Sequence, residues 1–220
     1  MTAPRWMIRH YEFGPFQNNV YLLEDLARRE AWLVDPSMES EPVLEEIRSR
    51  GLALKVILNT HGHLDHIYHN RLFQESTGAP IWIHAADVPM LEAARQQGMM
   101  FGIDVDPSPP PDRLLADGDC LEFADVQFEV LHTPGHTPGG VCLHAPGLLI
   151  AGDTLFAGSI GRTDLPGGSY ATLIRSIRSR LLPLPDDTRV LSGHGPETTI
   201  GRERGSNPFI LQPEAYGSLG

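Results

Sequence analysis

Short apolar runs alternate along the first half of the chain with stretches whose apolar residues have helical spacing. We expect strands at three compact apolar runs, residues 31–34, 55–58 and 81–83. Helices are predicted at three stretches that are each followed by a glycine, residues 42–50, 65–77 and 87–97. Asp87 is a candidate cap for the last of these helices, and Gly98 is its predicted end. Strands interleaved with helices favour a layered α/β fold.

The second half of the chain is richer in β-type patterns. Residues 126–131 alternate as a strand, and residues 141–143 and 148–150 are expected to pair as a hairpin around residues 145–147. A helix is predicted at residues 170–182 with Ser169 as its cap, and a last strand at residues 189–191. Two segments lack periodicity: the proline-rich residues 98–113, either a connector or a lid, and residues 201–220, a docked tail.

Composition and charge narrow the function classes. Glycine and proline contribute 22 and 19 of the 220 residues, which indicates many turns and loops. The formal net charge of −11 disfavours binding to nucleic acids and to anionic membranes. No signal-peptide pattern or membrane-spanning apolar stretch is present, so we expect a cytoplasmic protein. Cys120 and Cys142 are interpreted as core residues.

The ten histidines are the informative part of the composition, because several of them follow predicted strands together with carboxylates. If these strands point the same way, their carboxyl ends bring the polar groups to one rim, where α/β sheets place ligand sites. The groups that follow strands, in chain order, are His61, His63, Asp65, His66, His136, Asp153 and His194. Asp35 likewise ends the first predicted strand, and we expect it to brace the site from behind these groups.

Five imidazoles and two carboxylates packed together without a cation would be costly. Neutral histidine and ionised aspartate are ligands that divalent metals prefer, so a metal removes that cost. Seven ligands are too many for one tetrahedral ion with an open position. They suit two ions roughly 3.5–4 Å apart that share one bridging carboxylate.

The segment Thr60–His66, THGHLDH, resembles the T-H-x-H-x-D-H signature of the metallo-β-lactamase-fold hydrolases, and TPGHT, GDT and GHG follow in that family's order. The resemblance implies a four-layer αβ/βα sandwich with the metal site at the sheet edge, formed by residues 1–200 as one catalytic domain. It also implies the ligands: His61, His63 and His136 for one metal, Asp65, His66 and His194 for the other, and Asp153 as the bridge. Class B β-lactamases usually place a cysteine in the second site, so antibiotic hydrolysis is not expected.

Within the family, GDTLF at residues 152–156 and GSIGRTD at residues 158–164 look most like the glyoxalase II branch, which hydrolyses S-acylglutathione thioesters. The resemblance implies a metal-bound hydroxide that attacks the thioester, with Asp65 orienting it. Arg162 either orients the substrate or pairs with Asp164 to brace a loop. The chain is similar to a short, single-domain subgroup, because residues 201–220 contain no helical substrate domain and offer only two basic residues, Arg202 and Arg204.

Two other interpretations stay open at this stage. His61, His136 and Asp153 alone would form the two-histidine, one-carboxylate triad of non-haem iron oxygenases, and Gly161–Asp164 resembles the persulfide dioxygenases of this fold. A metal-stabilised scaffold without catalysis is the third hypothesis. Zinc is the expected metal, with iron or manganese as alternatives, because imidazole and carboxylate accept all three.

Overall fold

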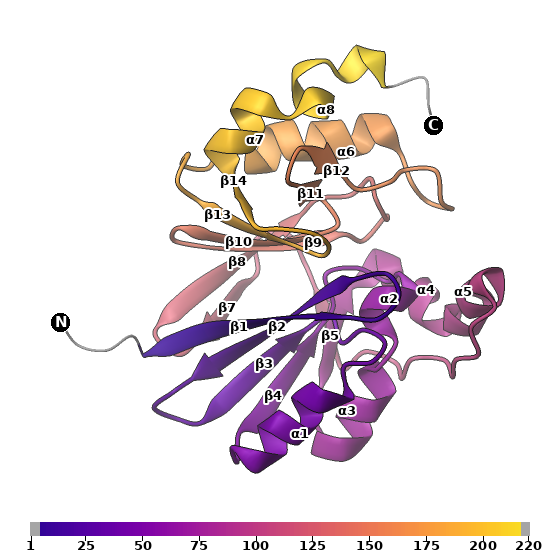
Figure 1. Ribbon diagram of the computed structural model, residues 1–220, viewed down its shortest axis with the longest axis vertical. Helices are drawn as coiled ribbons and strands as arrows, with labels where there is room; N and C mark the ends of the chain where they lie inside the picture. The colour runs from indigo at the N-terminus through magenta and orange to yellow at the C-terminus, as the bar shows by residue number, and fades with distance from the viewer. Residues whose placement is uncertain (1–4, 217–220) are drawn as a thin grey trace. The chain divides into compact units, whose positions relative to one another are not determined.

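The computed structural model describes residues 5–216 and divides into two compact units (Figure 1). The first unit runs to Leu115 and includes Glu122–Val126. The second unit contains Ala116–Leu121 and the chain from Gln127 onward. Each unit is described by itself below. Both contain a β-sheet and helices, which confirms the predicted mixed α/β class.

The first unit is built on a six-stranded sheet in which the strands lie in sequence order. Its first three strands are antiparallel, and the remaining neighbours are parallel. The strands are β1 (Trp6–Phe13), β2 (Asn18–Asp25), β3 (Glu30–Val34), β4 (Ala53–Leu58), β5 (Ile81–His84) and β6 (Arg113–Leu115). The predicted strands correspond to β3, β4 and β5, whereas β1, β2 and β6 were not predicted.

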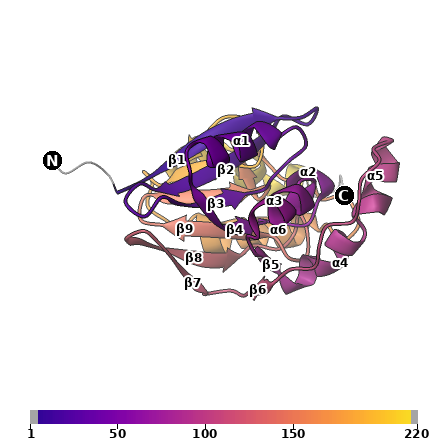
Figure 2. The ribbon, with the colours of Figure 1, turned by 90° about the horizontal axis from the view of Figure 1, so that it is seen from below.

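Helices cover one face of this sheet, with α1 and α3 packed on it in Figure 1 and α4 and α5 at one end of the unit in Figure 2. The core between sheet and helices contains alternate residues of the strands, such as Val20, Leu22 and Leu33, and the apolar stripe of α1. The helices are α1 (Glu41–Ser49), α2 (Leu64–Ile67), α3 (Asn70–Thr77), the 3-10 turn η1 (Ala85–Asp87), α4 (Val88–Glu92) and α5 (Ala94–Phe101).

The single helix predicted at residues 65–77 is wrong in one respect, because the structure breaks it into α2 and α3 at His69. The backbone N–H of His69 donates to the carbonyl of Pro36, 2.9 Å away, and its Nδ1 lies 3.1 Å from Ser40 Oγ. These bonds anchor the break to the loop that follows β3. Burial of the His69 ring lowers its pKa, which keeps the imidazole neutral at this position.

The next predicted helix, at residues 87–97, is also wrong, because the structure divides it into α4 and α5 at Ala93 and does not end it at Gly98. Helix α5 continues to Phe101, and Gly102 ends it with a left-handed φ of 69°. Gly98 is needed for a different reason: a Cβ there would overlap the carbonyl oxygen of Ile103, which packs against the helix after the turn. The segment 98–113 is therefore a loop only after this helical end.

The second unit is built on another six-stranded sheet, in the order β14-β13-β10-β9-β8-β7, apart from the strand residues among 122–126, which belong to the first unit. The strands are β7 (Cys120–Phe123), β8 (Val126–His132), β9 (Val141–Ala145), β10 (Leu148–Gly152), β13 (Arg189–Ser192) and β14 (Thr198–Thr199). A separate two-stranded hairpin is formed by β11 (Leu155–Phe156) and β12 (Ser159–Ile160). The predicted β9–β10 hairpin is confirmed, with Gly147 in the left-handed region at its turn.

Helix α6 (Tyr170–Ser176) continues into a π-helical turn, Ile177–Leu181, and is capped by Ser169 as predicted. The segment predicted as an irregular tail instead forms α7 (Ile200–Ser206), α8 (Pro208–Leu211) and the turn η3 (Pro213–Ala215). It is docked as expected, because Ile210 lies in the core of this unit with Leu173 and Ile177 of the α6 region, and Phe209 packs against that core. Residues 217–220 of that prediction lie outside the described residues. The division into one catalytic domain and a tail stays a prediction.

The two cysteines differ in their surroundings. Cys142 is buried as predicted, and burial raises the pKa of its thiol to about 11. Cys120 is exposed on β7, so its interpretation as a core residue is wrong. Over residues 5–216, no helix has the length and apolar character needed to cross a bilayer.

The packing at Gly98 gives a stability prediction. Gly98→Ala should lower the free energy of unfolding by about 1–3 kcal/mol, because the added methyl group overlaps the Ile103 backbone. Gly205→Ala in α7 is the matched control, since no atom other than its chain neighbours and the backbone of its own helix lies within 4 Å of its Cβ position. Urea unfolding of both variants checks this, and equal stabilities would contradict it.

Candidate metal centre

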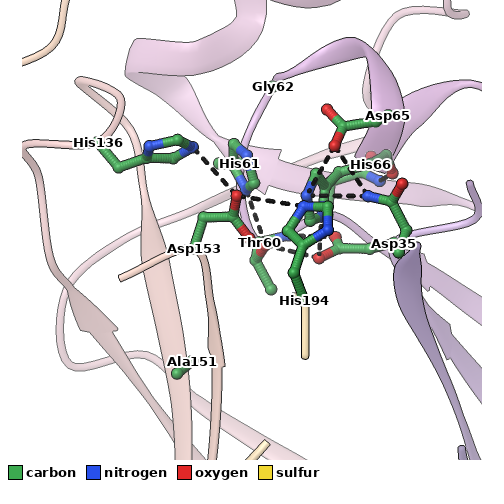
Figure 3. A network of polar contacts seen from close by, with 12 residues as sticks. Asp35, Thr60, His61, Gly62, Asp65, His66, His136, Ala151, Asp153 and His194 are labelled. Carbon is green, nitrogen blue, oxygen red and sulfur yellow. Dashed lines mark hydrogen bonds and ion pairs between the residues drawn. The ribbon is translucent and has the colours of Figure 1, made fainter. Parts of the chain in front are cut away.

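The ligand-type residues of the first unit lie on one short segment that follows β4. Its three histidines are buried, and their rings cluster, with the centroids of His61 and His63 5.0 Å apart. The centroids of His61 and His66 are 4.1 Å apart, and Figure 3 shows these two rings side by side. His66 and the half-buried Asp65 lie in α2, which begins one residue after His63. The structure therefore gathers the four predicted ligands of this unit.

The orientation of His66 is fixed from both sides of its ring. Its Nδ1 lies 3.0 Å from Oδ2 of Asp35, and its Nε2 lies 3.5 Å from Oδ2 of Asp65. Because an ionised carboxylate only accepts hydrogen bonds, Asp35 places the ring proton on Nδ1. The lone pair of Nε2 then points toward Asp65, which is the arrangement of a metal-ligating imidazole with a carboxylate behind it.

Asp35 occupies the bracing position predicted for it, at the end of β3. It is buried, and its backbone adopts a left-handed φ of 54°, which aspartate tolerates better than most residues. Its carboxylate accepts hydrogen bonds from the backbone N–H and the hydroxyl of Thr60, both at 2.7 Å, in addition to the contact with His66. Asp35 thus ties the start of the ligand segment to the ring of its last histidine. The close grouping of Asp35, His61 and His66 reflects this bracing.

Three further residues of the first unit hold the ligand segment, and sequence reasoning missed them. Asn18 donates to Asp65 Oδ2 at 2.9 Å and lies 3.3 Å from His66 Nε2. Asp87, interpreted as a helix cap, makes no such cap and instead accepts from the Gly62 N–H at 2.9 Å. Gln97 donates to the Gly62 carbonyl and accepts from the backbone N–H that follows His63, both at 3.0 Å.

The second unit carries His136, Asp153 and His194, each after a strand of its sheet. Strands β8, β10 and β13 point the same way, so these residues lie at one edge, as the rim argument predicts. They belong to a different sheet from β4, however, so the expectation of a single sheet edge for all seven groups is wrong. Oδ2 of Asp153 lies 3.5 Å from Nε2 of His136 and 3.5 Å from Nε2 of His194 (Figure 3).

The ring of His136 is oriented by backbone. Its Nδ1 lies 2.7 Å from the carbonyl oxygen of Arg162, which can only accept, so the ring proton is on Nδ1. This leaves Nε2 as the lone-pair atom that faces Asp153. Gly161 makes the approach feasible, because a Cβ there would overlap the Asp153 carbonyl and lie 3.0 Å from His136 Nδ1.

The Arg162 side chain is exposed and forms a two-pronged ion pair with Asp164, both bonds being 2.8 Å. The guanidinium holds the pKa of Asp164 at about 2, chiefly through these hydrogen bonds. The pairing matches the loop-bracing alternative for Arg162. Its substrate-orienting role stays a prediction.

The C-terminal helices position the β11–β12 hairpin beside this edge. The carboxylate of Glu203 is fully buried and accepts from the Gly158 N–H at 2.8 Å, and Asn207 donates to the Ser159 carbonyl at 2.9 Å. Phe156 of this hairpin lies with its ring centroid 6.1 Å from that of His194, edge to face. The segment predicted as a tail therefore supports the neighbourhood of one predicted ligand.

The spacing of the ligand atoms fits a divalent metal. Ligand atoms about 2.0–2.1 Å from one tetrahedral ion lie roughly 3.3 Å apart. Three imidazole-to-carboxylate pairs, Asp65–His66, His136–Asp153 and Asp153–His194, have N···O separations of 3.5 Å. Two of these imidazoles have their ring protons directed elsewhere, so acceptor atoms face each other. A cation between them satisfies both.

The bracing by Asp35 gives a prediction about metal affinity. Asp35→Asn should weaken metal binding by about 10–100-fold. One oxygen of the carboxylate accepts from Thr60 and the other from His66, whereas a side-chain amide has only one oxygen that can accept. Asparagine tolerates the left-handed backbone, so the fold should persist. Competition with a chromophoric chelator measures the affinity. Asp106→Asn, whose carboxylate is 72% exposed, is the control, and equal affinities in the two variants would contradict the role.

Comparison with known proteins places this chemistry in a family. The sequence profile of the metallo-beta-lactamase superfamily matches residues 13–194. Hydroxyacylglutathione hydrolase GloC of Haemophilus influenzae is 43% identical over 199 residues, which cover 89% of this chain and 93% of that protein.

Two solved structures show the same fold. BLEG-1 B3 metallo-beta-lactamase has a TM-score of 0.86 at 37% identity, covering 93% of this chain and 99% of that one. TTHA1623, solved in a di-iron-bound form, has a TM-score of 0.83 at 39% identity, with coverages of 91% and 99%. The sequence profile, the fold and the His/Asp cluster agree, and the chain belongs to the metallo-beta-lactamase superfamily.

Proposed function

We propose that this protein is a metal-dependent hydrolase of thioesters, with an S-acylglutathione as its favoured class of substrate. The observation that carries the hydrolase chemistry is the repeated 3.5 Å spacing between imidazole nitrogens and carboxylate oxygens. The thioester part is supported by the GDTLF and GSIGRTD segments and by the similarity to a hydroxyacylglutathione hydrolase.

The proposed ligands are those that the family resemblance implies. His61, His63 and His136 would hold one divalent ion, Asp65, His66 and His194 a second, and Asp153 would bridge them. Zinc is the proposed metal, with iron or manganese as alternatives, and iron has support from the di-iron form of a similar protein. When bound, such ions supply Lewis acidity and lower the pKa of a coordinated water from 15.7 to about 7.

The protein's own residues would orient the reaction. Asn18 donates to Asp65, whose carboxylate lies beside His66, and Asp65 would orient the attacking water. The ring protons of His66 and His136 are held by Asp35 and by the Arg162 carbonyl, which keeps each Nε2 deprotonated. The leaving thiolate has a conjugate-acid pKa of about 8.5, so the site needs no dedicated general acid.

The surroundings of His194 also favour a thioester over a lactone. Phe156 presents a ring edge to His194 and has no hydroxyl group that could donate to a substrate oxygen. Thioester cleavage does not require such a donor, because the leaving group departs as a stable anion.

Removal of single ligands tests the metal chemistry. His61→Ala and Asp153→Ala should each lower metal content and reduce hydrolysis of S-D-lactoylglutathione by at least about 100-fold, the scale of losing one key electrostatic group. His144→Ala is a matched control, because this histidine lies on β9 outside the cluster. Elemental analysis and thiol release are the measurements. Full metal content and activity in the Asp153 variant would overturn the assignment.

Metal content, thiol release and oxygen consumption, measured on one preparation of the protein, distinguish the competing functions. Hydrolysis predicts about two metals per chain and thiol release without oxygen. A persulfide dioxygenase would hold near one iron per chain and consume oxygen with glutathione persulfide. Hydrolysis of a β-lactam is measured as a third assay, because a B3 metallo-beta-lactamase is among the similar structures. Oxygen uptake without thioester cleavage would overturn the proposed hydrolase function and favour the dioxygenase.

A further inference from the structure

We propose that the end of α5 forms an apolar subsite for the acyl group of the thioester, which rests on the proposed function. The side chains of Met100 and Phe101 are 66% and 48% exposed, an unusual surface for two large apolar residues in sequence. They belong to the first unit, whose ligand segment lies against the same helix. The inference is that this protein favours thioesters with extended apolar acyl groups.

Met100 and Phe101 lie on the face of α5 that contacts the ligand segment. Gln97 bonds to the backbone on both sides of His63, through the Gly62 carbonyl and the Leu64 N–H. Met100 and Phe101 are three and four residues further along α5, so they lie on the same face of the helix as Gln97. The two apolar side chains thus lie one helical turn from Gln97, the residue that bonds to the ligand segment. Met99, two residues from Gln97, lies on a different face.

A second segment reaches the same place from the other side. Phe16, in the turn between β1 and β2, packs edge to face against Phe101, with ring centroids 5.5 Å apart. Two residues after Phe16, Asn18 contacts Asp65 and His66. Both segments that form the aromatic pair therefore also contact the ligand segment. An apolar group extending from the reacting carbonyl has a surface to contact there.

The local fold holds the end of α5 in place. The N–H of Ile103 donates to the Gly98 carbonyl at 2.9 Å, and that of Gly102 to the Met99 carbonyl at 3.3 Å, the pair of bonds of a Schellman motif. Gly98 allows the chain to return closely along the helix. The apolar side chains are therefore presented by a closed helix end.

Other occupants of this surface fit the observations less well. A stable protein interface uses roughly 20–30 residues per partner, far more than this small patch contains. A net charge of −11 opposes docking on an anionic bilayer. The acyl group of a substrate needs only a few apolar side chains close to the reacting atoms, which is what this surface provides.

Non-hydrolysable thioethers test the subsite by binding. The metal-loaded protein should bind S-hexylglutathione at least about tenfold more tightly than S-methylglutathione, since each buried methylene contributes up to about fourfold. Met100→Ser and Phe101→Ala should reduce this ratio to below about threefold. Met99→Ser is the matched control, because Met99 is 67% exposed on the same helix and should leave the ratio unchanged. Isothermal titration calorimetry measures the affinities.

Hydrolysis of S-acetylglutathione and S-hexanoylglutathione tests the apolar subsite separately from the proposed thioester hydrolysis. If both are cleaved and the preference for hexanoyl falls in the Met100 and Phe101 variants alone, the subsite is supported. If both are cleaved with equal preference in all variants, the subsite is overturned and thioester hydrolysis stands. If neither is cleaved, both proposals fall. A wild-type dimer that Phe101→Ala makes monomeric in light scattering would instead assign the surface to a second copy and overturn the subsite.

Discussion

The site depends on which nitrogen of each histidine ring carries the proton. An imidazole ring that is neutral carries one proton, and the partner of that proton decides which nitrogen keeps a lone pair. Asp35 takes the ring proton of His66, and the Arg162 carbonyl takes that of His136. In each unit the other nitrogen is left facing a carboxylate oxygen at 3.5 Å. Acceptor atoms placed against each other favour a cation between them, so the residues of each unit are suited to bind a metal.

Much of the local fold in the first unit follows from fixing those acceptors. The left-handed backbone of Asp35, the break between α2 and α3 and the placement of α5 all serve the segment that begins at Thr60. Gln97 and Asp87 satisfy backbone groups of this segment where neither a helix nor a sheet can. Such bonds hold the ligands rigidly, which limits the reorganisation needed when a metal binds.

The sequence indicated the ligand-type residues because their chemistry is unusual and their positions follow strand ends. His61 to His66, His136, Asp153 and His194 needed only residue type, strand direction and a family resemblance. The residues behind them were not predictable in the same way. Asn18 and Gln97 are ordinary polar residues whose roles arise from tertiary contacts, and Asp87 was interpreted locally as a cap when its real partner is the distant Gly62.

The errors in secondary structure have the same origin. Gly98 has the residue type of a helix end, but it serves as a point of close approach for the returning chain. The break at His69 depends on bonds to the loop after β3, which periodicity cannot reveal. The C-terminal helices lack a regular apolar pattern because they are held partly by polar bonds, above all those of Glu203.

The basic residues of the chain bear on where substrate recognition lies. Arg204, one of two arginines that follow His194, donates to the carbonyls of Leu182 and Leu184 and pairs with Asp186. Arg162 is paired with Asp164. A glutathione carboxylate that recruited either guanidinium would have to compete with an existing carboxylate partner. Under the proposed function, the apolar surface at the end of α5 would meet no such competition from a carboxylate, which favours the acyl half of the substrate over the thiol half as the basis of selectivity.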